Sequence, residues 1–171
     1  HTIVLLTADH GEEFGEHGVF DHGNSLYAPS VRVPLLIVAP NRAPAARVVT
    51  APVTLRDLAA TLTDLAHLPP SDGFPGRSLA RFWLGNPPPV TDSVSPVLSE
   101  VSKGIRTPAW YPVSRGNMRS LADSQVRYIL GGDGTEQLFS LGDVWESRPL
   151  ADSVPVLAPF RETLRRLPWR Q

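Results

Sequence analysis

An apolar run that leads into an aspartate–histidine pair constrains this chain more than any other feature. Residues 2–7 read Thr-Ile-Val-Leu-Leu-Thr, and after a single alanine come Asp9, His10 and Gly11. A continuous apolar run rich in β-branched residues is typical of a strand buried on both faces of a parallel sheet, so it predicts an α/β fold. Ligands of open α/β sheets bind beyond the carboxyl ends of the strands, which is where Asp9 and His10 are expected to lie.

The polar stretch that follows predicts either a solvated loop or a site. Asp9 offers a hard oxygen and His10 a neutral nitrogen, so these two are the candidate metal ligands. Asp9 capping a turn with His10 packed nearby is the alternative. His22 is placed to donate a hydrogen bond to an anionic substrate or a proton to a leaving group. The same stretch holds four acidic residues, expected to be exposed or to pair with arginines such as Arg32: Glu12, Glu13, Glu16 and Asp21.

Composition excludes several classes of site and partner. The chain has 171 residues, enough for one domain with a core, and it contains no cysteine. Disulfides, thiolate zinc sites and a cysteine-derived nucleophile are therefore excluded within it. A net charge of −1 gives no field that would steer the chain to nucleic acid or to an anionic membrane. No apolar run is long enough to predict a transmembrane segment.

The remaining pattern predicts a second, smaller region. Thr54 begins a helical pattern over 54–67, and Ser78 caps a short helix over 78–84. The proline-rich stretch 86–95 is predicted to be a linker. Residues 1–101 are expected to complete a mostly parallel sheet, and residues 102–171 to form a small antiparallel subdomain with a terminal helix. Its elements are a strand at 96–101 leading in, short strands at 119–122, 125–130 and 136–140, and a helix over 155–167.

Three ordered motifs together resemble the sulfatases of the alkaline phosphatase superfamily. They are residues 7–18, which begin Thr-Ala-Asp-His-Gly-Glu; residues 22–27, His-Gly-Asn-Ser-Leu-Tyr; and residues 31–37, Val-Arg-Val-Pro-Leu-Leu-Ile. The helix and loop at 53–62 and 76–79, and the segment 136–141 with Glu146 and 149–151, are also similar. The resemblance covers nearly the whole chain but only the C-terminal part of the family's domain.

The resemblance implies a metal-dependent hydrolase. The positions of Asp9 and His10 are metal ligands in this family, and the position of His22 contacts the sulfate. The implied ion is calcium, with zinc, manganese or magnesium as alternatives, and it neutralises charge that develops on the ester's oxygens. Lys103, after the strand at 96–101, is a further candidate for substrate contact, with a solvated loop charge as the alternative. Family habit also implies a place outside the cytoplasm.

Three functions remain open from the sequence. The leading one is a sulfuric ester hydrolase acting on a small-molecule or glycan sulfate ester. The second is a phosphoryl enzyme of the same superfamily, such as a phosphoethanolamine or phosphoglycerol transferase or a phosphodiesterase. The third is a non-catalytic binding module.

The chain lacks the nucleophile that the resemblance requires. In sulfatases a formylglycine arises from the first residue of a Cys/Ser-x-Pro-x-Arg motif near the N-terminus, and this chain contains no such motif. We therefore expect residues 1–171 to be a truncated C-terminal portion, inactive alone, whose partner is the missing N-terminal part of the same protein. The exposed backbone and apolar surface of the first strand would make such a fragment poorly soluble by itself.

Overall fold

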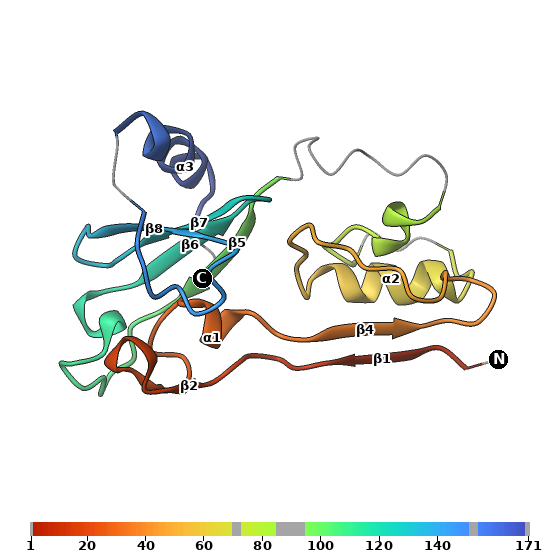
Figure 1. Cartoon of the computed structure of the whole chain (residues 1–171), viewed down its shortest axis with the longest axis horizontal. Helices are drawn as coiled ribbons and strands as arrows, with labels where there is room; N and C mark the ends of the chain where they lie inside the picture. The colour runs from red at the N-terminus through yellow and green to blue at the C-terminus, as the bar shows by residue number, and fades with distance from the viewer. Residues whose placement is uncertain (1, 70–72, 85–94, 151–153, 170–171) are drawn as a thin grey trace. The chain divides into compact units, whose positions relative to one another are not determined.

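The computed structural model describes residues 2–69, 73–84, 95–150 and 154–169. The chain forms two compact units, one from residues 1–9 and 33–95 and the other from residues 10–32 and 96–171 (Figure 1). The predicted linker over 86–95 lies almost wholly outside the described residues. The chain therefore leaves the first unit after Asp9 and returns to it at Val33.

The first unit is built on a two-stranded antiparallel ribbon. Strands β1 (Val4–Thr7) and β4 (Leu35–Val38) pair so that Val4 lies opposite Val38 and Thr7 opposite Leu35. The mixed α/β class is confirmed, but no large parallel sheet is seen among the described residues, whose sheets are all small and antiparallel. The sequence could not show this, because an apolar run reports burial, whereas it carries no information about the direction of the neighbouring strand.

The two faces of this ribbon differ in what covers them. Leu35 and Ile37 pack against a small core of Ala51, Leu79 and Phe82. The opposite face is apolar and exposed, with exposed fractions of 45–57% for Val4, Leu6, Leu36 and Val38. The apolar composition that suggested burial on both faces is thus real, but the described chain covers only one of them.

A helix and the turn after it complete the first unit. Helix α2 (Asp57–Leu65) confirms the predicted helix, although it begins three residues after Thr54. The predicted short helix is a 3-10 turn, η2 (Leu79–Phe82), and the Ser78 hydroxyl accepts a hydrogen bond from the Ala80 amide as expected. The buried Asp57 carboxylate fixes this turn to α2, because it accepts the Arg77 amide at 2.9 Å and pairs with Arg81 at 3.0 Å.

The second unit contains the predicted antiparallel meander. Its sheet runs in the order β5 (Val97–Val101), β6 (Met118–Ala122), β7 (Val126–Leu130) and β8 (Glu136–Ser140). The terminal helix α3 (Val154–Arg166) is confirmed too. A 3-10 turn, η3 (Pro112–Arg115), lies between β5 and β6.

Both faces of this sheet are covered by other parts of the same unit. Alternation along the strands sends Leu121, Tyr128 and Leu138 into one core, where Leu157, Phe160 and Leu164 of α3 meet them. It sends Met118, Ile129 and Phe139 into a second core, where Leu26 and Tyr27 meet them. Figure 1 shows α3 on one side of the sheet and α1 on the other. The segment 10–32 therefore packs on one face of this sheet through Leu26 and Tyr27.

The segment 10–32 is more ordered than the predicted loop. It contains β2 (Glu13–Phe14), the 3-10 turn η1 (Glu16–Gly18), β3 (Phe20–Asp21) and a single helical turn α1 (Ala28–Val31). Strands of two residues leave too little periodicity for a sequence pattern to reveal. The hairpin reverses through left-handed backbone at Gly15, His17 and Gly18.

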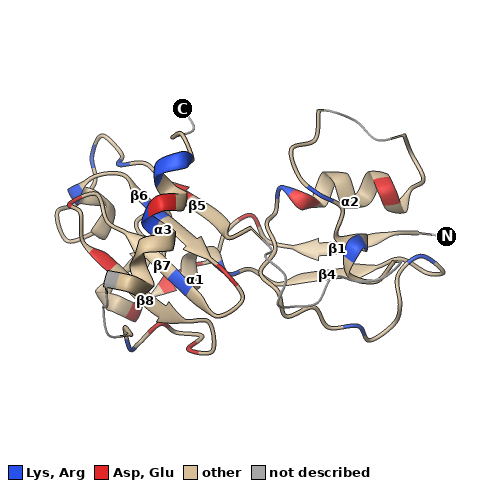
Figure 2. Cartoon of the chain, turned by 90° about the horizontal axis from the view of Figure 1, so that it is seen from above, with Lys and Arg blue, Asp and Glu red and all other residues tan. Residues whose placement is uncertain are grey.

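Charge is mixed over both units. Figure 2 shows Lys and Arg interspersed with Asp and Glu along the elements of each unit, in keeping with the net charge of −1. Across the described ranges, every helix is too short or too polar to cross a bilayer.

Candidate active site

The hairpin of β2 and β3 gathers polar side chains at its open end. Its ladder pairs Glu13 with Asp21 and Phe14 with Phe20, so the residues just outside the ladder, Glu12 and His22, face each other. Ligand atoms of Glu12, Asp21 and His22 all lie within 4.8 Å of one another. Residues ten positions apart in the sequence thus form one exposed cluster.

His22 is held in this cluster by two carboxylates. Its Nδ1–H lies 3.1 Å from Glu12 Oε2 and 3.1 Å from Asp21 Oδ1, while its side chain is 46% exposed. The expectation of exposure or pairing with arginines such as Arg32 holds for Asp21, whose side chain is 66% exposed. It is wrong for Glu13, which is buried and bonded to serines. With Nδ1–H committed to carboxylates, Nε2 is the ring atom that can meet a substrate.

His10 stacks on His22. The two imidazole centroids are 4.0 Å apart with 21° between the ring planes. The Nδ1–H of His10 donates to its neighbour's carbonyl, Gly11 O, at 2.9 Å, which selects the tautomer whose ligand atom is Nε2. Metal-binding histidines commonly have such a bond from the second ring nitrogen, so His10 fits the role of a neutral nitrogen ligand.

Gly11 explains why a glycine follows the Asp-His pair. A Cβ at this position would lie 1.9 Å from the Pro29 carbonyl oxygen, and the Gly11 amide donates to Ser30 O at 2.8 Å. A larger residue would push the chain away from α1 and displace His10 with it. Glycine is needed for this close approach.

The structure brings together some of the predicted site residues. Asp9 is exposed and is the last residue of the first unit before the chain passes to His10. Lys103 is exposed, and its amide donates to Asn117 Oδ1 at 2.9 Å.

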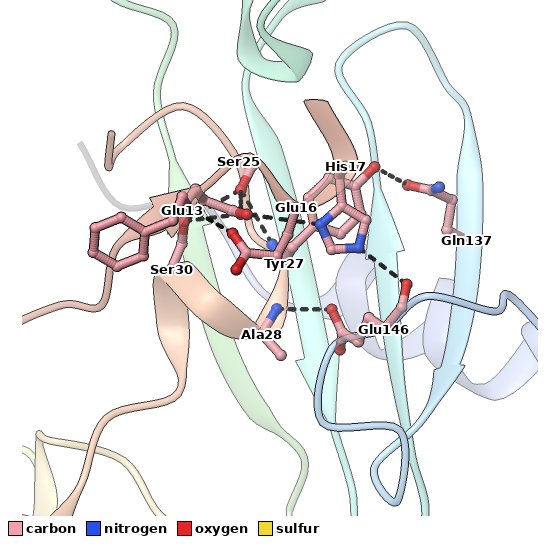
Figure 3. A network of polar contacts seen from close by, with 10 residues as sticks. Glu13, Glu16, His17, Ser25, Tyr27, Ala28, Ser30, Gln137 and Glu146 are labelled. Carbon is pink, nitrogen blue, oxygen red and sulfur yellow. Dashed lines mark hydrogen bonds and ion pairs between the residues drawn. The ribbon is translucent and has the colours of Figure 1, made fainter. Parts of the chain in front are cut away.

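Beneath the exposed cluster, a buried network anchors the same hairpin (Figure 3). Glu13 is 1% exposed, and its Oε1 accepts hydrogen bonds from Ser25 Oγ at 2.7 Å and Ser30 Oγ at 3.1 Å. Glu13 and Phe14 are neighbours on β2, so the alternation that buries Glu13 turns Phe14 outward. The hairpin is thereby fixed from its inner side.

His17 belongs to this inner network. Its ring stacks on Tyr27 at 3.8 Å, its Nε2–H donates to the Glu146 carbonyl at 3.0 Å, and Nδ1 lies 3.7 Å from Glu13 Oε2 (Figure 3). The His17 side chain is only 15% exposed. Its surroundings are those of a structural histidine, in contrast to His22.

Glu146 ties the segment 10–32 to the meander. Its carboxylate accepts from Arg127 Nε at 2.7 Å and from the Ala28 amide at 2.7 Å, at the start of α1. Burial raises the pKa of Glu146, and the charge of Arg127 opposes that rise. Tyr27 adds a bond from its hydroxyl to Gln137 on β8 at 3.0 Å, and burial raises the pKa of this phenol.

Sequence reasoning missed the partners of His22. The signal that identifies them is the pairing of short strands on either side of η1, which puts Glu12 opposite His22. Two strands of two residues produce no alternating pattern long enough to detect, so the pairing was visible only in the fold.

Comparison with known proteins gives a consistent set of relatives. A family model described as Sulfatase matches residues 1–68. Arylsulfatase K of Danio rerio is 33% identical over 166 residues, which cover 90% of this chain and 28% of that protein. A phosphonate monoester hydrolase from Silicibacter pomeroyi is 28% identical with a TM-score of 0.68, over 96% of this chain and 33% of that one.

A further solved structure supports the fold alone. It is described as a 2-O GAG sulfatase, and it is 24% identical with a TM-score of 0.70 over 95% of this chain. The chain spans 28% of the Danio rerio protein and 34% of this solved chain. The similarity therefore extends over nearly all of this chain but over only about a third of each relative's length.

Proposed function

Because the chain belongs to the sulfatase family of the alkaline phosphatase superfamily, we propose that it supplies part of the active site of a metal-dependent sulfuric ester hydrolase. In this proposal Asp9 and His10 are metal ligands and His22 acts on the substrate side. The observation that carries the proposal is the packing of His22 against His10 at 4.0 Å, with His22 oriented by Glu12 and Asp21.

The donor set of Asp9 and His10 fits a divalent cation. The carboxylate suits calcium, zinc, manganese and magnesium alike, whereas the imidazole nitrogen mildly favours zinc over calcium. Calcium is our first choice because of the family. When bound, such an ion would neutralise charge on the non-bridging oxygens of the ester. The His10 bond to the Gly11 carbonyl keeps the ring in the ligand tautomer before any ion arrives.

We assign proton donation at the leaving oxygen to His22. Its Nδ1 is committed to Glu12 and Asp21, so the proton would pass from Nε2. The two carboxylates orient the ring through its Nδ1–H, as the aspartate of a catalytic triad does for its histidine. A cation at this position would also bind the negatively charged ester before reaction.

The nucleophile in this proposal comes from outside the chain. There is no cysteine and no Ser-x-Pro-x-Arg motif in the 171 residues, which span less than a third of the Danio rerio relative. We propose that a full-length protein carries the nucleophile and further carboxylate ligands upstream, and that residues 1–171 alone hydrolyse nothing. The exposed apolar face of the β1–β4 ribbon is where upstream chain would pack.

The test is hydrolysis by the full-length protein. We expect turnover of 4-nitrophenyl sulfate, loss of that turnover after treatment with a chelator, and recovery on adding calcium. Elemental analysis should find a divalent metal that Asp9→Ala reduces. Turnover by purified residues 1–171 would contradict the placement of the nucleophile. A full-length protein with no bound divalent ion and no turnover would instead favour the binding module.

A phosphoryl enzyme is the second candidate. The observation that favours it is the phosphonate monoester hydrolase, which is 28% identical to this chain over 96% of its length. The same assay separates the two candidates when 4-nitrophenyl phosphate and phenyl 4-nitrophenyl phosphonate are run beside the sulfate ester. If kcat/KM for either phosphorus ester is higher than that for 4-nitrophenyl sulfate, the phosphoryl enzyme replaces the sulfuric ester hydrolase as the first candidate.

A further inference from the structure

Two phenylalanines stand exposed beside the candidate site. Phe14 is 76% exposed and Phe20 is 61% exposed, and they are directly paired across the hairpin of β2 and β3. Paired residues of antiparallel strands hold their Cβ atoms about 5 Å apart, so the two rings form one continuous apolar surface. A pair of large aromatic side chains in water signals that the surface contacts something else.

These rings border the catalytic cluster. Glu12 precedes Phe14 by two residues on an extended chain, so both lie on the outward side, opposite buried Glu13. Glu12 in turn bonds His22 at 3.1 Å. Phe14 and the Glu12 side chain that bonds His22 therefore lie on the same side of β2.

The hairpin holds both rings in place before anything binds. The Phe14 amide donates to Glu16 Oε2 at 2.6 Å, which fixes the backbone that carries this ring. A Cβ at Gly15 would lie 3.1 Å from the tip of the Phe20 ring, so that ring rests over the glycine. A surface already ordered in this way loses little conformational entropy on binding.

We infer that Phe14 and Phe20 form the wall that binds an apolar, ring-shaped leaving group of the ester, such as an aryl group. This inference rests on the proposed function. A leaving group must lie next to the residue that protonates its oxygen, which we assign to His22. Phe20 precedes His22 by two residues on the hairpin, and Phe14 is paired with Phe20. The aromatic wall offers no hydrogen-bonding groups, so it favours an apolar ring over a polyhydroxylated one.

The test uses the full-length protein with Phe14→Ala, Phe20→Ala and the double variant. We expect KM for 4-nitrophenyl sulfate to rise about tenfold for each single change, since most of the contact of one ring is lost, while kcat changes less than twofold. The inhibition constant of inorganic sulfate, which has no leaving group, should stay unchanged. Phe14→Leu and Phe20→Leu keep apolar bulk and should fall between the parent and the alanine variants.

Ile105→Ala is the matched control, because Ile105 is fully exposed in the same unit but lies outside the hairpin. Equal rises in KM and in the sulfate inhibition constant would show that the rings only support the site, and would overturn the inference. So would a fall in Tm with unchanged KM, because the rings would then be covered by other parts of the protein.

Failure of the proposed function gives a different result. If the parent protein hydrolyses no ester, the proposed hydrolase function is wrong. The aromatic wall is then tested separately by measuring the binding of 4-nitrobenzenesulfonate by calorimetry. Weaker binding of this compound by the double variant, with unchanged binding of inorganic sulfate, keeps the inference. Equal binding by parent and variant overturns it.

Discussion

The two sides of the segment 10–32 present histidines in opposite circumstances. On the inner side, the His17 side chain is 15% exposed, stacked on Tyr27 and bonded to the Glu146 carbonyl. On the outer side, His22 is 46% exposed and is oriented by two carboxylates through one ring nitrogen only. Residue type and sequence spacing do not separate these histidines, whereas their surroundings do.

The difference shows how a short segment can carry a site. Its inner side is fixed to the meander by buried polar contacts of Glu146 and Tyr27, and its outer side carries the exposed His10 and His22. Positioning of this kind is what a catalytic group needs, because small displacements of a reacting group cost much of the rate. The inner network is therefore expected to control stability and the outer cluster to control chemistry.

The largest expected effect is on the outer side. His22→Asn in the full-length protein should lower kcat/KM by about a hundred- to ten-thousandfold, because it removes a proton donor. The free energy of unfolding should change by less than about 0.5 kcal/mol, since His22 is exposed. His67→Asn is the matched control, an exposed histidine of the other unit with a left-handed backbone (φ 55°) that asparagine tolerates. A large loss of stability in His22→Asn would break the comparison.

The next effect belongs to the inner side. Glu146→Ala should lower the free energy of unfolding by about 3–5 kcal/mol, because it leaves the buried Arg127 charge without its partner. Denaturant unfolding followed by near-UV circular dichroism measures this change. Glu162→Ala is the control: Glu162 also pairs with arginines, Arg165 and Arg166, but at the surface, and its loss should leave stability nearly unchanged. Similar losses of unfolding free energy in both variants would show that the buried Glu146–Arg127 pair does not stabilise the inner side more than a surface ion pair does.

A smaller effect is expected for His17→Asn. The change removes the stack on Tyr27 and the bond to the Glu146 carbonyl, which together are worth about 2 kcal/mol. Asparagine accommodates the left-handed backbone at this position (φ 57°), so strain does not enter. At a temperature where the variant is fully folded, kcat/KM should remain within about twofold of the parent, well below the loss that a missing proton donor causes. A loss as large as that of His22→Asn would give His17 a chemical role.

The same contrast explains how much could be predicted from the sequence. The meander, α2 and α3 were predicted closely, because their apolar periodicity is long and local. The antiparallel pairing of β1 with β4 was not predicted, because Ile3 to Leu6 looks the same beside a parallel or an antiparallel neighbour. The roles of Asp9, His10 and His22 are predictions that rest on motif order, and the structure adds the partners of His22, which depend on pairing across η1.

The smallest effect concerns a partly exposed arginine–glutamate ion pair, which is the counterpart of the buried pair of Arg127 and Glu146. Arg161 on α3 pairs with Glu136 on β8, with side chains 32% and 20% exposed, against 9% and 1% for Arg127 and Glu146. Hydrogen bonds from Arg161 hold the pKa of Glu136 below its usual value. A carboxylate with a lowered pKa stabilises the fold above its unfolded pKa, and that contribution is lost as the pH falls through the folded value. The Tm of the parent should therefore fall on acidification from pH 6 to pH 3, and that of Glu136→Gln should fall less. Thermal melts across this range measure the difference, and identical pH profiles would show that solvent screening cancels the pair.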